Sequence, residues 1–175
     1  MSGRSAQKAE TIKLVVLDVD GVMTDGTLLY GDHASSEIKA FNVKDGLGIK
    51  LLLEKGIEVA IITGRSSEAL ERRSAELGIS FLIQGRDDKG AALQELLAKL
   101  KITASDAAYM GDDLPDLPAL QLAGLATCPS DAAAPIIDAA DWIAPQPGGH
   151  GAVRALCDFI LAAQDPTHDQ PHLNR

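Results

Sequence analysis

Residues 11–25 read Thr-Ile-Lys-Leu-Val-Val-Leu-Asp-Val-Asp-Gly-Val-Met-Thr-Asp, and the interpretation of the whole chain starts from this stretch. Residues 12–17 are rich in aliphatic and β-branched side chains, a pattern typical of a strand buried on both faces. The run ends on Asp18 and Asp20, and Gly21 follows at once. Because open α/β folds bind ligands at the carboxyl ends of their strands, we expect the two acids at the functional edge of a sheet.

Two carboxylates this close repel each other unless a cation or a proton is shared between them. Hard carboxylate oxygens at the end of a rigid strand suit Mg²⁺. A calcium-binding EF-hand loop is disfavoured, because Val22 stands where a third acid is needed and a strand pattern replaces the preceding helix. For this short motif taken alone, an acidic surface turn stays an equal alternative.

The chain has 175 residues, of which 46% are hydrophobic, enough for one α/β domain with its own core. We expect this domain to span residues 1–163 and residues 164–175, with two prolines and little to bury, to form a mobile tail. The net charge of −9 argues against nonspecific nucleic-acid binding, which needs a basic face.

The sequence also indicates where the protein resides. No segment approaches the roughly 18 consecutive apolar residues of a membrane span, and residues 1–10 lack the apolar stretch of a signal peptide. Cys128 and Cys157 lie far apart and outside any paired spacing, so we expect ordinary buried thiols. These features predict a cytoplasmic protein with no membrane segment.

Beyond residue 42 the chain alternates between strand and helix patterns. Strands are predicted at residues 58–63, 80–83, 107–110, 125–127 and 141–143. Helices are predicted at residues 49–55, 67–77, 88–100, 115–123, 131–137 and 151–163. This alternation specifies a Rossmann-like, doubly wound parallel sheet with helices on both faces.

Residues 26–41 interrupt that pattern. Two short apolar stretches flank a Gly31-Asp32 turn, which predicts a β-hairpin inserted after the first strand. An isolated two-stranded hairpin is marginally stable in water. We therefore expect it to pack against a neighbouring subunit.

Three further strand ends carry residues suited to phosphate chemistry. They are Thr63-Gly64-Arg65, Lys89 at the start of a helix, and Gly111-Asp112-Asp113 with Asp116. Each alone has a simpler explanation, namely a turn hydroxyl, a solvated lysine and a helix cap. Together with Asp18 and Asp20 they supply acids for a divalent ion and donors for phosphate oxygens, which is what phosphoryl transfer requires.

These four segments resemble the four motifs of the haloacid dehalogenase superfamily, and the resemblance covers essentially the whole chain. It implies that Asp18 is the nucleophile and that Asp20 is the general acid and then base. It further implies that Thr63 and Lys89 hold the phosphoryl oxygens. Mg²⁺ would be bound by Asp18, the backbone carbonyl of Asp20, and Asp112, with Asp113 and Asp116 behind them.

Within that superfamily the chain most resembles the 3-deoxy-D-manno-octulosonate 8-phosphate phosphatases, through the hairpin, Phe41-Asn-Val-Lys-Asp-Gly46, Ile62-Thr-Gly-Arg65 and Gly148-Gly-His-Gly-Ala-Val-Arg154. The resemblance implies hydrolysis of a sugar-acid phosphate for the lipopolysaccharide inner core. It also implies a homotetramer whose hairpins form a central barrel, so that a neighbour completes each site. The implied substrate contacts are Asp20, Asn42, Val43, Lys44, Asp45, Gly46, Lys50, Arg65, Arg73 and Lys89.

The chain departs from that family in three places. His150 stands where a basic residue is usual, Ala155 replaces a glutamate, and residues 165–175 match no family pattern. These differences leave the four chemical motifs intact. They put in question any role of the tail as a lid over a neighbour's site.

Three alternatives remain open from the sequence. The substrate could instead be a nine-carbon sugar-acid phosphate such as a neuraminate 9-phosphate. A phospho-accepting signalling domain uses similar residues, but its accepting aspartate lies on the third strand, whereas here Asp-x-Asp comes first. A catalytically silent subunit that assembles through its hairpin is disfavoured by the intact acids.

Overall fold

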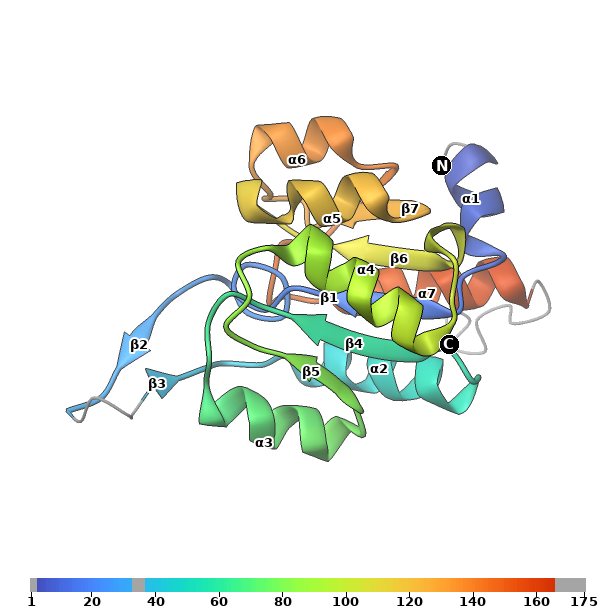
Figure 1. Ribbon diagram of the computed structural model, residues 1–175. Coiled ribbons are helices and arrows are strands. Elements are labelled where there is room, and N and C mark those ends of the chain that lie inside the picture. The colour runs from blue at the N-terminus through green and yellow to red at the C-terminus, as the bar shows by residue number, and fades with distance from the viewer. Residues whose placement is uncertain (1–2, 33–36, 166–175) are drawn as a thin grey trace, which may run out of the picture.

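The protein forms a six-stranded sheet in which every neighbouring pair of strands is parallel (Figure 1). The computed structural model describes residues 3–32 and 37–165. The strands are β1 (Leu14–Leu17), β4 (Glu58–Ile62), β5 (Phe81–Ile83), β6 (Ala107–Met110), β7 (Leu125–Cys128) and β8 (Trp142–Ile143). Their order is β5-β4-β1-β6-β7-β8, which confirms the predicted doubly wound α/β fold.

Helices cover both faces of the sheet because both faces of its central strands are apolar. Val15 and Leu17 of β1 pack on one side, and Leu14 and Val16 on the other. The first face is covered by α1 (Gly3–Ala9), α2 (Val43–Glu54), α3 (Glu68–Leu77) and α7 (Ala152–Gln164). The second is covered by α4 (Lys89–Leu100), α5 (Leu117–Leu122) and α6 (Ala134–Ala139). Two short 3₁₀ turns, η1 (Ala104–Asp106) and η2 (Leu114–Asp116), flank β6.

The strand register places the chemical motifs side by side. Leu17 of β1 pairs with Ile61 of β4 and with Met110 of β6. The three strands therefore end at the same edge, where parallel sheets place their ligands. Asp18, Thr63 and Asp112 follow these strand ends within two residues.

Several helix boundaries differ from the prediction. Helix α2 begins at Val43, six residues before the expected start, because the Asn42 side chain accepts a hydrogen bond from Lys44 N and caps the helix. Helix α6 is shifted toward the C-terminus, at Ala134–Ala139, with a proline in its first turn. Helix α1 was not predicted at all.

The end of α7, near the C-terminus of the described chain, contacts the end of α1 and the residues just after it. The Gln164 side chain, at the end of α7, donates hydrogen bonds to the carbonyl oxygens of Ala9 and Ile12. Gln164 is the last residue of α7 and lies one position beyond the predicted end of the domain. Of the expected tail, residues 166–175 lie outside the described residues.

The predicted hairpin is present and consists of β2 (Leu29–Tyr30) and β3 (Glu37–Ile38), paired antiparallel. It extends away from the sheet and its helices, at the left of Figure 1. Leu29, Tyr30 and Ile38 are 45%, 71% and 58% exposed, so the described residues of the hairpin form no apolar core within this chain. Residues 33–36, between the two strands in the sequence, lie outside the described part.

No helix in residues 3–32 and 37–165 has the length and apolar character needed to cross a membrane.

The two cysteines are buried and unpaired, as the sequence predicts. Cys157 lies where α7 packs tightly on α2, close to Gly48, at which an added Cβ would approach the Cys157 Sγ to 3.1 Å. Burial raises the pKa of Cys128 to about 11 and that of Cys157 further. Neither thiol is ionised near neutral pH.

We therefore expect both thiols to be inert in the folded protein. A disulfide reagent such as 5,5′-dithiobis(2-nitrobenzoate) at pH 8 should titrate no thiol in the native protein, since the thiolate is the reacting form. It should titrate both thiols in guanidinium chloride. Rapid reaction of one thiol in the native protein would contradict the burial seen at α7 or β7.

Candidate active site

The carboxyl edge of the sheet carries a polar cleft of about 210 Å³. Its walls come from the ends of β1, β4 and β6 and from the start of α4. The lining residues are Asp18, Asp20, Thr63, Gly64, Arg65, Asp87, Lys89, Asp112, Asp113, Pro115 and Asp116. One cleft thus brings together all the residues that the sequence singled out for catalysis and metal binding.

Lys89 is the central cation of this cleft. It is the first residue of α4 and only 5% exposed, which excludes the solvated helix-end lysine considered from the sequence. Its Nζ lies 2.9 Å from Asp18 Oδ1 and 2.6 Å from Asp116 Oδ1. Burial by itself lowers the pKa of Lys89, but the two carboxylates outweigh it and leave that pKa raised. The lysine therefore stays charged.

Asp116 has both of its oxygens engaged. Oδ1 accepts hydrogen bonds from Lys89 Nζ and from the Tyr109 hydroxyl, at 2.6 and 2.7 Å. Oδ2 accepts from the backbone amides of Asp112 and Asp113, at 3.1 and 3.3 Å. Asp116 therefore fixes the loop after β6 and the position of Lys89.

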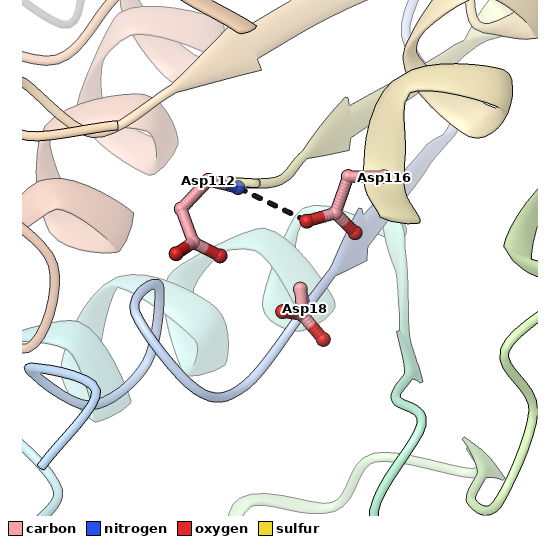
Figure 2. A group of neighbouring side chains, drawn as sticks. All are labelled: Asp18, Asp112 and Asp116. Carbon is pink, nitrogen blue, oxygen red and sulfur yellow. Dashed lines mark hydrogen bonds between the residues drawn. The ribbon is translucent and has the colours of Figure 1, made fainter. Parts of the chain in front are cut away.

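The carboxylates of Asp18, Asp112 and Asp116 form the cluster in the described residues that could hold a metal ion, with oxygens within 4.8 Å of one another (Figure 2). Burial, followed by the charge of Asp116, raises the pKa of Asp18 to about 6. Burial and the charge of Asp18 raise that of Asp112 to about 7. Buried oxygens that repel one another fit a hard divalent cation.

Within this cluster Asp18 and Asp112 are the better candidates for ligands, because Asp116 is already saturated by hydrogen bonds. The backbone also makes room for Asp112. Gly21 has a φ of 92°, and a Cβ there would overlap the Asp112 carboxylate. Only glycine adopts this positive φ without strain and also leaves room for the carboxylate.

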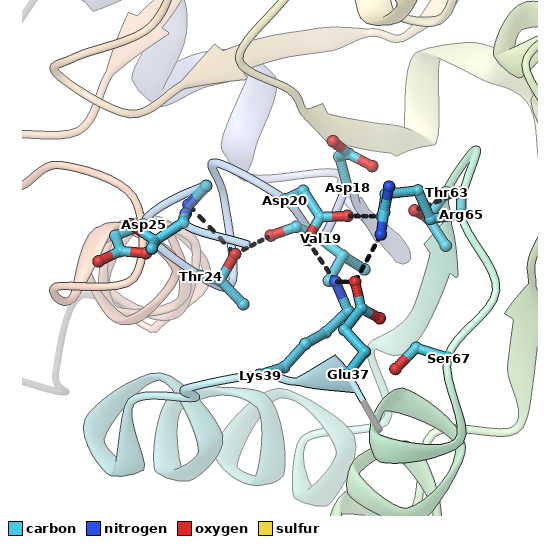
Figure 3. A network of polar contacts seen from close by, with 12 residues as sticks. Asp18, Val19, Asp20, Thr24, Asp25, Glu37, Lys39, Thr63, Arg65 and Ser67 are labelled. Atoms are coloured by element: carbon cyan, nitrogen blue, oxygen red, sulfur yellow. Dashed lines mark hydrogen bonds and ion pairs between the residues drawn. The ribbon is translucent and has the colours of Figure 1, made fainter. Parts of the chain in front are cut away.

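Asp20, by contrast, turns toward the hairpin (Figure 3). Its Oδ1 lies 2.5 Å from Lys39 Nζ, and its Oδ2 lies 3.6 Å from Arg65 Nε. Glu37 closes the network, since its Oε1 accepts a hydrogen bond from Arg65 at 2.6 Å and lies 3.5 Å from Lys39. An Asp20 side chain engaged in this way agrees with the expectation that only its backbone carbonyl faces a metal.

Comparison with known proteins adds a separate observation. A family model described as haloacid dehalogenase-like hydrolase matches residues 79–156. A protein of *Escherichia coli* K12 named 3-deoxy-D-manno-octulosonate 8-phosphate phosphatase KdsC is 49% identical over 157 residues, which cover 90% of this chain and 83% of the relative. The chain belongs to this phosphatase family, among the haloacid dehalogenase-like hydrolases.

Solved structures agree with the assignment. The enzyme of that name from *Moraxella catarrhalis*, solved with magnesium, phosphate and KDO, superposes with a TM-score of 0.91 at 48% identity, covering 94% of both chains. The cobalt-bound form from *Haemophilus influenzae* gives a TM-score of 0.87 at 44% identity, covering 90% of this chain and 92% of the other. The predicted family and superfamily are thus both confirmed.

The remaining substrate contacts that the family resemblance implies do not line the cleft within this chain. They belong to two helices beside the hairpin, namely Asn42, Val43, Lys44, Asp45, Gly46 and Lys50 at α2 and Arg73 on α3. Asp45 is buried, and its Oδ1 accepts a hydrogen bond from Arg154 N at the start of α7, which gives it a structural role. The Arg73 guanidinium lies against Gly46. Their contacts with substrate stay a prediction.

A second hollow of about 220 Å³ lies beside the start of α2 and includes Asn42 and His150. The His150 ring nitrogen Nδ1 lies 2.8 Å from the carbonyl oxygen of Gly148. This residue, which departs from the family pattern, therefore stabilises its own turn.

Sequence reasoning missed three residues of the site. Tyr109 is the one polar-tipped side chain in the buried strand β6, and a buried tyrosine hydroxyl normally requires a partner. Glu37 and Lys39 are polar residues on either side of Ile38. That alternation signals a polar face on the hairpin, although it does not say what the face meets.

The saturation of Asp116 leads to a prediction on stability. Asp116→Ala removes the acceptor for Lys89, for the Tyr109 hydroxyl and for two amides. Because it leaves a buried cation short of one partner, we expect the free energy of unfolding to fall by about 3–5 kcal/mol. Chemical denaturation measures the change.

A matched control is Asp138→Ala, on the exposed surface of α6. It should change the free energy of unfolding by less than about 0.5 kcal/mol. Equal stability of the two variants would show that Asp116 is not structural.

Proposed function

We propose that the protein is a Mg²⁺-dependent phosphatase that hydrolyses 3-deoxy-D-manno-octulosonate 8-phosphate to the free sugar acid and phosphate, in the synthesis of the lipopolysaccharide inner core. The observation that carries this proposal is the single cleft in which Asp18, Lys89 and the Asp112 carboxylate converge, in a chain of this phosphatase family. A relative named for this activity is 49% identical to the chain over 157 residues.

In the proposed reaction two acids, Asp18 and Asp20, carry the chemistry. An oxygen of the Asp18 carboxylate attacks phosphorus, and the bond between phosphorus and the sugar oxygen breaks. Asp20, as the acid, gives its proton to that oxygen, so the sugar leaves as an alcohol. Water then attacks the phosphorus of the aspartyl-phosphate and passes a proton to Asp20, and Asp18 is released as a carboxylate.

Thr63 and Lys89 hold the phosphoryl oxygens in this proposal. Thr63 is buried at the end of β4, and Lys89 already lies beside the Asp18 oxygen. Preorganised donors of this kind stabilise charge in the transition state without moving. The carboxylates of Asp18 and Asp112, with the Asp20 carbonyl, would hold Mg²⁺, and the ion would offset the negative charge of phosphate when bound.

The substrate also carries a carboxylate and several hydroxyl groups, and cationic residues suit it. Arg65 lies at the rim of the cleft, with its side chain 44% exposed. Lys44, Lys50 and Arg73 would act with it, in the same site or across a subunit boundary. The two free buried thiols support a cytoplasmic location, where disulfides are rare.

The decisive test is phosphate release from 3-deoxy-D-manno-octulosonate 8-phosphate, with Mg²⁺ and with excess chelator, beside a panel that includes a neuraminate 9-phosphate. We expect kcat/KM for the eight-carbon substrate to exceed that for the others by at least about tenfold. We also expect activity to vanish with the chelator and return with Mg²⁺. An even spread over the panel would keep the chemistry and reject the substrate.

Asp18→Asn serves as the control, since the amide is a poor nucleophile of nearly the same shape. Turnover should fall below detection. Release of many phosphates per wild-type chain, rather than retention of one, also separates an enzyme from a phospho-accepting signalling domain.

We further infer that the protein assembles as a homotetramer through its hairpin. The support is the exposure of Leu29, Tyr30 and Ile38 on a hairpin whose described residues form no apolar core of their own. Val43 and Leu47, at the start of α2, are also exposed, at 79% and 51%. Burying such a surface against other copies removes apolar area from water.

The double variant Leu29→Glu, Ile38→Lys tests this assembly. The two positions pair across the hairpin, so opposite charges preserve the pairing while making the surface polar. We expect the mass from light scattering to fall from that of four chains to that of one. Ile143→Lys, on the edge strand β8, should leave it unchanged. A variant hairpin that still assembles would place the interface elsewhere.

A further inference from the structure

Lys39 is a buried cation that none of the four motifs contains. It follows β3 in the hairpin, and its side chain is only 3% exposed. The ammonium group lies 2.5 Å from Asp20 Oδ1 and 3.5 Å from Glu37 Oε1. Lys39 does not line the cleft itself, so it acts on the site through its contact with Asp20.

The arrangement is costly unless every charge in it is paired. A lysine withdrawn from water loses its hydration and needs nearby carboxylates in return. Lys39 has two, and the second of them, Glu37, is itself held by Arg65 at 2.6 Å. Burial acts to raise the pKa of Glu37, but Arg65 and Lys39 keep it below its usual value. Two cations and two anions therefore form a closed network, seen in Figure 3.

This network also joins the hairpin to the cleft. Among the described residues, two cross-strand pairs define the hairpin ladder, and its apolar side chains point to solvent. By contrast, Lys39, the residue that follows β3, contacts Asp20 directly. The position of the hairpin and the orientation of the Asp20 carboxylate are thus set by the same contact.

We propose that Lys39 is a positioning residue for Asp20: its ammonium group holds the Asp20 carboxylate in the orientation in which it takes a proton from the water that hydrolyses the phosphorylated Asp18. In that step the water oxygen bonds to phosphorus, the bond from phosphorus to the Asp18 oxygen breaks, and the proton passes to Asp20. The inference rests on the proposed phosphatase function and adds to it a residue from the hairpin.

Lys39→Met tests the inference, since it keeps most of the side-chain length and removes the charge. With p-nitrophenyl phosphate, whose leaving group needs no proton, formation of the phosphoenzyme should continue while its hydrolysis slows by about 10²-fold. We expect a burst of nitrophenolate approaching one per site, followed by slow turnover. Quenched samples should carry one phosphoryl group on Asp18 by mass spectrometry.

Lys13→Met is the control, because Lys13 also pairs with an aspartate, Asp106, but with a side chain that is 66% exposed and at the opposite edge of the sheet. It should show wild-type kinetics. Lys39→Arg, which restores a cation, should recover most of the hydrolysis rate. Lys39→Gln replaces Lys39→Met if the latter does not fold, as judged by circular dichroism.

The outcomes separate the two proposals. If the wild type releases no phosphate, the proposed function fails. If the wild type turns over and the neutral variants show no burst, or only a higher KM, Lys39 merely anchors the hairpin and the inference is overturned. A burst with phosphorylated Asp18, reversed in Lys39→Arg, supports it.

Discussion

The buried contact of the Lys89 ammonium group with the carboxylates of Asp18 and Asp116 is the interaction on which the site depends. It joins the end of β1, the turn after β6 and the start of α4, three segments far apart in the sequence. A buried cation has to be paired, so this contact fixes all three segments relative to one another. Tyr109 reinforces it from the core, through its hydroxyl on Asp116.

The cleft has two walls of different electrostatic character. On one side Asp18 and Asp112 concentrate negative charge, and their pKa values are raised by burial and by the charge of neighbouring carboxylates, Asp116 for Asp18 and Asp18 for Asp112. On the other side Arg65 lines the cleft beside Asp20, and Lys39, outside the lining, contacts Asp20 as well. A divalent cation would pair with the carboxylates on the first side, and the phosphate group with the cations on the second. A chain of net charge −9 can therefore bind an anionic substrate.

Much of this arrangement was predictable from local patterns. All six sheet strands were expected, because runs such as residues 12–17 are apolar on both faces and turn residues bound them. The motif residues were expected to converge, because parallel strands end at one edge. Helix α1 was missed, since seven residues with little apolar periodicity acquire their helical stability from packing on α7 and from the Gln164 hydrogen bonds.

The sequence by itself determined the fold class, the family and the identity of the acids, because strand periodicity and the residues at strand ends are local properties. Only the tertiary structure decided which carboxylate oxygens are already occupied by hydrogen bonds and ion pairs. Asp116 differs from Asp112 because Tyr109 and Lys89 reach it, and Lys39 meets Asp20 because the return segment of the hairpin passes beside the end of β1. Such contacts join residues distant in sequence, and burial sets their energies, so no local pattern specifies them.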